Sequence, residues 1–216
     1  MDKKQVRASF VKTGRTIYIS HLDLLRTMQR ALKRAHIPAW YSEGYNPRIY
    51  LSFPLALSVG IVGKHEFMDF YITEEISFEE IKDRMNGVLP EGLHIIEVHS
   101  PVNEAKDIFG AEYVIKMSGK DIAAHFEQFI SADRIDVKKH SRKKGEIILD
   151  IKPYTEILSK AVNGDELAAE IRLPAGNELN INPALFLDAF AERYGEPEKV
   201  YVERTKILCD MGTEFV

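Results

Sequence analysis

The sequence contains a single cysteine, Cys209, among its 216 residues. One cysteine cannot form an internal disulfide, and it cannot supply the ligands of an iron–sulfur cluster or of a four-cysteine zinc site. Apolar runs are also short, since eighteen apolar residues never follow one another and the N-terminus MDKKQVRASF lacks an apolar stretch after its lysines. We therefore expect no membrane span, no secretory signal, no cofactor bound by this chain and a cytoplasmic location.

The sequence also lacks the motifs of several catalytic classes. It has no GxxxxGKS/T, GxGxxG or GxSxG pattern, so nucleotide hydrolysis and serine esterase chemistry gain no support. His21 and Asp23, with His65 and Glu66, are residue types that bind metals. On a helix, however, the spacing of His21 and Asp23 does not place both on one face as an i, i+4 pair would. We predict no catalytic residue and no metal site.

Negative charge is in excess overall, but basic residues are concentrated in the first part of the chain. The formal net charge is −4. Residues 1–64 nevertheless hold eleven Lys and Arg against three acids, a charge of +8, which leaves −12 for the rest. This asymmetry is typical of a local electrostatic footprint for a polyanion on an acidic protein. A solvated basic helix with no partner would give the same bias.

The first half of the sequence predicts one α+β unit. Alternation in VRASFVK indicates a strand, and Ser20 is the expected cap of a helix from His21 to about His36, which Pro38 ends. Apolar residues at helical spacing make the buried stripe of this helix: Leu24, Leu25, Met28, Leu32 and Ala35. The remaining elements are extended stretches in PAWYSE and RIYLSF, a strand in HEFMDFYIT, a helix in SFEEIKDRMNGVL and a strand in LHIIEVHS.

The second half repeats this order. It predicts a strand in AEYVIKMS, a helix in KDIAAHFEQFIS, a hairpin in IDVKKHSRKKGEIILDIKP that turns near 143–145, a less regular stretch in YTEILSKAVNG, a strand in ELAAEIRLP, a helix in ALFLDAFAERYG and a last strand in KVYVERTKILC. Such an order is that of the ferredoxin-like arrangement. We therefore predict an α+β protein of two tandem ferredoxin-like (βαββαβ) sandwiches, a basic-helix domain over 1–109 and a second domain over 110–216.

The candidate site is YSEGYNPRIYLSF, residues 41–53, together with the basic helix. In RIYLSF, alternate residues share a face, so Ile49, Leu51 and Phe53 are expected in the core. The other face then carries Arg48, Tyr50 and Ser52, and alternation in the neighbouring strands adds Phe67, Asp69, Tyr71, Arg7 and Ser9. A ferredoxin-like sheet has helices on one face only, so we expect an open face of aromatic and arginine side chains. Such a surface suits single-stranded RNA, because rings stack on bases and arginines meet phosphates.

Two groups of residues make up the predicted binding site for RNA or a partner. The full set is Arg15, His21, Arg26, Arg30, Lys33, Arg34, Tyr41, Tyr45, Asn46, Arg48 and Tyr50. The basic residues of the helix would steer phosphate and the tyrosines would stack, while Gly44 and Asn46-Pro47 shape the loop by turn chemistry. The alternative is that the second domain packs on the open face, so that its rings form an interdomain core.

The run SHLDLLRTMQRALKRAHIPAWYSEGYNPRIYLSFPLALSVG resembles the N-terminal signature of the radical SAM-linked (radical SAM-associated) protein family. The segments ILDIKPYTEIL, LNINPALFLDAF and VERTKI extend the resemblance over most of the chain. Members of that family are fused to, or encoded beside, radical SAM proteins of the cobalamin-binding type. The resemblance implies a radical SAM protein as a partner in trans and, from neighbouring RNA-processing genes, a possible RNA substrate such as tRNA or rRNA. A radical SAM enzyme needs three closely spaced cysteines for its cluster, so this chain cannot be that enzyme itself.

We therefore expect an accessory, non-catalytic RNA-binding or substrate-presenting partner of a radical SAM enzyme. Two alternatives stay open, and the first is a protein-docking module for that partner without RNA. The second is a metal-independent RNA endonuclease with His21 as general acid–base, because tandem ferredoxin-like domains with a histidine beside the first helix also resemble CRISPR RNA endonucleases of the repeat-associated type. The glycine-rich loop expected near the C-terminus of those enzymes is missing, which counts against the second alternative.

Overall fold

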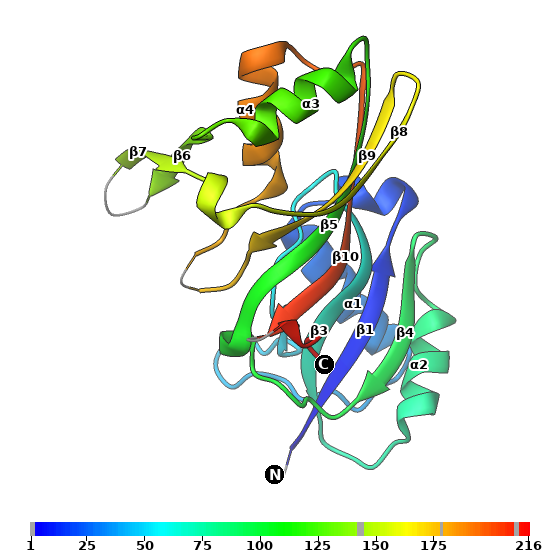
Figure 1. The fold of residues 1–216 in the computed structure, drawn as a ribbon. Helices are drawn as coiled ribbons and strands as arrows, with labels where there is room; N and C mark the ends of the chain where they lie inside the picture. The colour runs from blue at the N-terminus through cyan, green and yellow to red at the C-terminus, as the bar shows by residue number, and fades with distance from the viewer. Residues whose placement is uncertain (1–2, 142–144, 178, 210–211) are drawn as a thin grey trace. The chain divides into compact units, whose positions relative to one another are not determined.

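The computed structural model of the chain describes residues 3–141, 145–177, 179–209 and 212–216. The chain divides into two compact units: unit 1 is Met1–Ile108 with Glu214–Val216, and unit 2 is Phe109–Thr213. Residues 214–216, which fall within the predicted second domain, belong to unit 1 by their contacts. Each unit combines helices with a β-sheet, so the predicted α+β class is confirmed (Figure 1). Within the described residues, no helix has the length and hydropathy needed to cross a membrane.

Unit 1 is an antiparallel sheet with two helices. Its elements in chain order are β1 (Lys4–Lys12), the 3-10 turn η1 (Gly14–Tyr18), α1 (His21–Arg34), β2 (Leu51–Ser52), β3 (Val62–Ile72), α2 (Phe78–Asn86), β4 (Leu93–His99) and the 3-10 turn η2 (Ala105–Asp107). β1 lies between β4 and β3, and β2 pairs with β3. The spatial order β4-β1-β3-β2 is that of a ferredoxin-like βαββαβ unit, as the sequence predicted.

Strand alternation and helical spacing build the core of unit 1. The core joins Val6, Ala8 and Phe10 of β1, Met68, Phe70 and Ile72 of β3 and Leu24, Met28 and Leu32 of α1. Ser20 caps α1, since its Oγ accepts a hydrogen bond of 3.1 Å from the Asp23 N–H. α1 ends at Arg34 because His36 adopts a φ of 52°, which cannot continue a right-handed helix.

The segment between α1 and β2 differs from the prediction. Instead of a strand in PAWYSE, two isolated bridges join Ala39 to Ile72 and Tyr41 to Ile49, and within RIYLSF only β2 is a strand. Gly44 has a φ of 121°, and Pro47 has no N–H to give to a ladder. These residues replace regular pairing with an irregular loop.

Unit 2 repeats the order of unit 1 with one insertion. Its elements are β5 (Ile108–Ser118), α3 (Ile122–Ser131), β6 (Asp136–Ser141), β7 (Gly145–Asp150), the 3-10 turn η3 (Lys152–Tyr154), β8 (Glu156–Asn163), β9 (Glu166–Pro174), α4 (Pro183–Tyr194) and β10 (Lys199–Cys209). The order β10-β5-β9-β8 is again ferredoxin-like, and β6 with β7 forms a separate hairpin.

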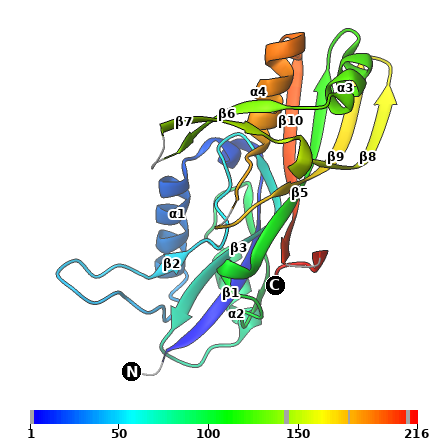
Figure 2. The same cartoon turned by 60° about the vertical axis from the view of Figure 1, so that its left-hand side comes forward.

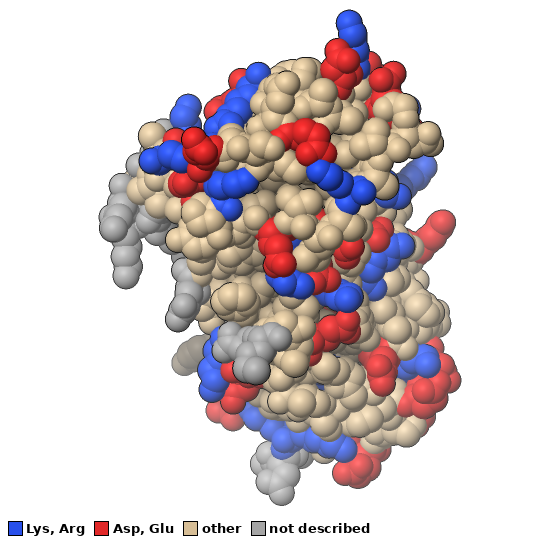
Figure 3. Space-filling model, in the orientation of Figure 1, with Lys and Arg blue, Asp and Glu red and all other residues tan. Residues whose placement is uncertain are grey.

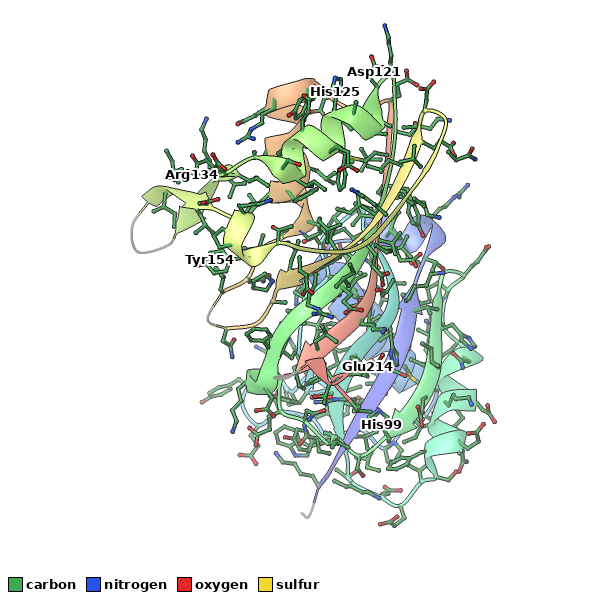
Figure 4. The ribbon with its side chains drawn as sticks, in the orientation of Figure 1. His99, Asp121, His125, Arg134, Tyr154 and Glu214 are labelled. Carbon is green, nitrogen blue, oxygen red and sulfur yellow. The ribbon has the colours of Figure 1, made fainter. Side chains whose placement is uncertain are left out.

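Arg193 of α4 donates a 2.8 Å hydrogen bond to the Arg134 carbonyl oxygen, which ties this hairpin to α4. His125 of α3, labelled in Figure 4, stacks on Tyr194 of α4 with ring centroids 4.9 Å apart.

One prediction for unit 2 was wrong. The stretch expected to be less regular contains β8, which pairs with β9 at the edge of the sheet. Most of its residues are exposed, and a register shift between Ile157 and Ser159 breaks the period of two, so no apolar alternation marks the strand. The predicted turn at 143–145 lies mainly outside the described residues, and Gly145 begins β7.

Candidate nucleic-acid interface

α1 separates apolar and basic residues on opposite sides. Its buried residues Leu24, Met28, Ala31 and Leu32 belong to the core of unit 1. The four basic residues singled out from the sequence are all exposed: Arg26, Arg30, Lys33 and Arg34. Residues three and four apart on a helix share a side, so core packing on one side leaves these cations on the other. α1 therefore presents a positively charged side to solvent.

Gln29 joins α1 to the segment that follows it. The Gln29 Nε2 donates a hydrogen bond of 2.7 Å to the Ile49 carbonyl oxygen. Arg26 and Lys33 lie three residues before and four residues after Gln29, so both share its stripe of the helix. Those two cations therefore border the segment that contains Ile49.

Arg34 and Arg26 each have a hydrogen-bond partner within unit 1. The Arg34 Nη2 donates a 3.0 Å hydrogen bond to the carbonyl oxygen of Val88, just after α2, so this guanidinium is on the other flank of α1. Arg26 lies 3.4 Å from the Asp23 carboxylate, and both side chains are more than half exposed. Exposed ion pairs of this kind contribute little and exchange readily, so Arg26 stays available to another anion.

Residues 41–50, here called the tyrosine loop, extend away from the sheet of unit 1 (Figure 2). Ser42 and Arg48 close its base: the Ser42 N–H donates to the Arg48 carbonyl oxygen at 2.8 Å, and the Arg48 N–H donates to the Ser42 Oγ at 3.2 Å. Tyr45 is fully exposed, with a relative accessibility of 105%. A ring held entirely in water adds nothing to the core, and both of its faces are open to stacking.

Three rings form a cluster at the base of the tyrosine loop. The ring centroids are 5.9 Å apart for Trp40 and Tyr50, 5.5 Å for Tyr50 and Tyr71, and 6.1 Å for Trp40 and Tyr71. The Lys3 Nζ lies 3.5 Å from the Trp40 ring centroid, a cation–π contact. Trp40 and Tyr71 are half-buried and Tyr50 is exposed, so the cluster offers one ring and one cation to a ligand.

The loop tyrosines lie on both faces of the sheet edge. Tyr41 bridges Ile49, which is buried, and directly paired residues point to the same side, so Tyr41 lies on the side of α1. Tyr71 alternates with the core residues Phe70 and Ile72, which places Tyr71 and its neighbour Tyr50 on the helix-free face. Tyr41 therefore lies on the same side of the sheet edge as α1, whereas Tyr50 faces the opposite way.

Arg15 and His21 are not part of this arrangement. Both are exposed, but they lie at the start of α1, while the tyrosine loop follows its end. His21 lies about two turns of α1 before Gln29, the helix residue that contacts the tyrosine loop. The His21 ring contacts Phe53 edge-on at 5.3 Å.

Within the described residues, no three His, Cys, Asp or Glu side chains group together to hold a metal ion.

The prediction of an open helix-free face was wrong for its central residues. Arg7, Ser9, Phe67 and Asp69 are all buried. The Arg7 guanidinium pairs with the Asp69 carboxylate through two hydrogen bonds of 2.7 and 2.8 Å. This face is also not uniformly basic, since acidic and basic side chains are interspersed over unit 1 in Figure 3.

The C-terminal tail of unit 1, residues 214–216, accounts for part of this burial. The Phe215 ring lies 5.3 Å from Phe67 and 4.2 Å from the Arg7 guanidinium carbon. The Arg7 Nη1 also donates a 2.7 Å hydrogen bond to the Val216 carbonyl oxygen. The views of Figures 1 and 2 show α1 on one side of this sheet and the chain end on the other.

Trp40 of the ring cluster and Lys3, which contacts the Trp40 ring, were not predicted as site residues. Trp40 is the only tryptophan of the chain, and it falls within the quoted motif segment PAWYSE. Lys3 directly precedes β1 and alternates with Gln5 and Arg7, a pattern that places it on their side of the chain. The uniqueness of Trp40 and this alternation were the available signals.

Comparisons with known proteins identify a family but no activity. A family model described as "Uncharacterized protein conserved in bacteria (DUF2344)" matches residues 5–183. No curated protein matches the chain. Among solved structures, a chain of a Cbf5-Nop10-Gar1 complex aligns with a TM-score of 0.46 at 10% identity, and the match covers 93% of this chain and 48% of that one. The present chain thus spans about half the length of that relative. An unknown protein from Galdieria sulphuraria aligns with a TM-score of 0.29 at 12% identity, covering 94% of this chain and 99% of that one.

Proposed function

Because the chain belongs to the bacterial DUF2344 family, whose description gives no activity, we propose a function from the chemistry of unit 1: a non-catalytic RNA-binding protein that presents an unpaired RNA segment to a partner enzyme. The observation that carries this proposal is the Gln29 hydrogen bond to Ile49, which joins the basic side of α1 to the tyrosine loop. A surface that binds a single strand needs cations that contact its phosphates and exposed rings that stack on its bases.

Each part of this surface has a distinct role in the proposal. Arg26, Arg30 and Lys33 contact successive phosphates, since all three are exposed on one side of α1. Tyr41 and Tyr45 stack on bases, at about 1–3 kcal/mol for each base. Arg48 and Asn46 are exposed in the same loop and supply hydrogen bonds to phosphates and base edges.

The partner enzyme in this proposal is a radical SAM protein of the cytoplasm. The support is the sequence resemblance carried by SHLDLLRTMQRALKRAHIPAWYSEGYNPRIYLSF, which contains both α1 and the tyrosine loop. The same segment thus carries the resemblance and the surface chemistry. A tRNA or rRNA is the proposed substrate, held here while the partner carries out the reaction.

The test is binding of the purified full chain to tRNA and rRNA fragments at two salt concentrations. Replacing Arg26 and Lys33 with Glu should weaken binding and make the salt slope shallower by about 1.4, for two lost contacts to single-stranded phosphate. The matched control is Lys120→Glu with Lys138→Glu, which makes the same charge change at exposed lysines of unit 2. Equal losses in both double variants would show that net charge, not this surface, governs binding.

The same samples are examined for RNA cleavage. Cleavage that disappears in His21→Ala would replace the proposal with the endonuclease alternative. If the unmodified protein binds no RNA at low salt, the proposal fails.

Docking of a protein without RNA is the second candidate, favoured by the cluster of Trp40, Tyr50 and Tyr71 with Lys3. Tryptophan and tyrosine are enriched at the energetic centres of protein interfaces. A radical SAM partner bound with little salt dependence, and released by Tyr50→Ala but not by the Arg26/Lys33 double variant, would support docking in place of RNA binding.

A further inference from the structure

The sheet of unit 2 has a hollow of about 640 Å³ on one of its faces. Its lining comes from the ends of all four strands, β5, β8, β9 and β10. Lys116 pairs directly with Ala168, and Ala168 pairs directly with Ala161, so these three side chains point to one side. Met117 and Leu167, the next residues along β5 and β9, are buried on the other side. The hollow therefore lies on the face opposite the core of unit 2.

Small side chains form the floor of this hollow. Ala161 and Ala168 face each other across β8 and β9 where most positions of an exposed sheet face carry longer side chains. Their methyl groups leave a flat apolar surface between longer residues, and the volume falls within the range of about 300–1,000 Å³ typical of small-molecule sites.

Two lysines and a tyrosine stand at one end of the hollow. The Lys116 Nζ lies 5.5 Å from the centroid of the Tyr201 ring, and Lys199 is two residues before Tyr201 on the same face of β10. Across the described residues, no acidic side chain forms an ion pair with Lys116 or Lys199. Two unpaired cations beside an apolar floor, in a part of the chain that is acidic overall, favour an anionic ligand.

Groups able to hydrogen-bond the edge of a base line the neighbouring row of this face, which begins at Ser118, whose carbonyl oxygen accepts a 2.8 Å hydrogen bond from the Glu198 N–H beside Lys199. Ser118 pairs directly with Glu166, and Glu166 pairs directly with Asn163, so a hydroxyl, a carboxylate and an amide share one row across the sheet. Together they offer both donors and acceptors, which a nucleobase edge requires and a simple anion does not.

We propose that this hollow binds a nucleoside monophosphate unit, with its phosphate on Lys116 and Lys199, its base flat on Ala161 and Ala168, and the base edge toward Asn163 and Glu166. The nucleotide is either free or an unpaired residue of an RNA strand. All residues that line the site belong to unit 2, so the proposal does not depend on the function proposed for unit 1.

The experiment follows backbone amide signals of the full chain by NMR during titration with UMP, uridine, inorganic phosphate and octauridylate. UMP should shift the amides of Lys116, Ala161, Ala168 and Tyr201, and uridine should bind roughly tenfold more weakly because its charge-assisted contacts are missing. Lys116→Met should weaken UMP binding by roughly tenfold. Lys120→Met, an exposed lysine of the same unit outside the hollow, should leave it unchanged.

A second variant tests the cavity rather than the charge. Ala168→Phe fills the floor with a residue that strands accept, and it should abolish binding while the amide spectrum stays that of a folded sheet. Shifts at these amides with octauridylate alone, lost in the same variants, would support the site with RNA as the source of the nucleotide. No shift with either ligand, or inorganic phosphate binding as tightly as UMP, would overturn the proposal. The Arg26/Lys33 double variant distinguishes failure of this proposal from failure of the function proposed for unit 1, because it changes no residue of the hollow.

Discussion

The Gln29 Nε2 of α1 donates a hydrogen bond of 2.7 Å to the carbonyl oxygen of Ile49, and this contact fixes the base of the tyrosine loop against the basic helix. Ile49 is buried, so its carbonyl has little access to water if the donor is removed. A buried acceptor left without a partner costs more than the bond itself contributes.

Gln29→Met, which keeps the length of the side chain and removes the donor, should lower the free energy of unfolding by about 1–3 kcal/mol. Gln29→Glu should lower it further, because a carboxylate would then face a carbonyl oxygen. Urea unfolding measures the free energy of unfolding of both variants. RNA affinity should also fall more in Gln29→Glu than in Gln29→Met. If Gln29→Met is as stable as the unmodified protein, the hydrogen bond does not hold the loop.

The buried pair of Arg7 and Asp69 should be needed as a pair. Their side chains are 1% and 10% exposed, so Arg7→Met leaves an uncompensated carboxylate and should cost about 3–5 kcal/mol of unfolding free energy. Adding Asp69→Leu should recover much of that loss, as a double-mutant cycle would measure. The control is Arg84→Met, which breaks an exposed ion pair with Glu80 and should cost no more than about 1 kcal/mol. A double variant no more stable than Arg7→Met would contradict this account.

Much of each unit could be predicted from the sequence because local patterns determine it. Alternation located β1, β3, β5, β9 and β10, and helical spacing with Ser20 located α1. The order of these elements led directly to the ferredoxin-like arrangement, whose sheet orders both units display. The edge strand β8 could not be found in this way, because most of its side chains are exposed and carry no apolar period.

The candidate site was only partly predictable for a different reason. Alternation correctly placed Phe67 and Asp69 on the helix-free face, but it cannot report what covers a face. That information resides in Phe215 and Val216, which contact β1 and β3 from the far end of the sequence. Likewise, spacing identified the cations of α1, whereas the Gln29 bond that associates Arg26 and Lys33 with the tyrosine loop is a long-range contact.

The tail contact should be visible in amide exchange. The N–H groups of Val102 and Asn103 both donate to the Val216 carbonyl oxygen at 3.1 Å. Phe215→Ala removes a buried ring that anchors the tail, so both amides should exchange faster, and unit 1 should lose stability by up to about 3–5 kcal/mol. Phe215→Leu should give a smaller effect on both measurements. Unchanged exchange at Val102 and Asn103 in Phe215→Ala would show that the tail is held without the ring.

Tyr201 should make the stability of unit 2 depend on alkaline pH. Tyr201 is 39% exposed, and its partial burial, with the hydrogen bond that its hydroxyl donates to Glu203, raises its pKa from 10.0 to about 12. The folded state therefore keeps a proton that the unfolded chain releases above pH 10, so this contribution to stability is complete below pH 10 and is lost as the pH rises toward 12. The absorbance of tyrosinate measures the titration of the phenols. Tyr201→Phe should remove the phenol that titrates last. Glu203→Gln should lower the pKa of Tyr201, whereas Glu196→Gln, an exposed acid elsewhere in unit 2, should not. If Tyr201→Phe leaves the latest-titrating phenol in place, the assignment to Tyr201 is wrong.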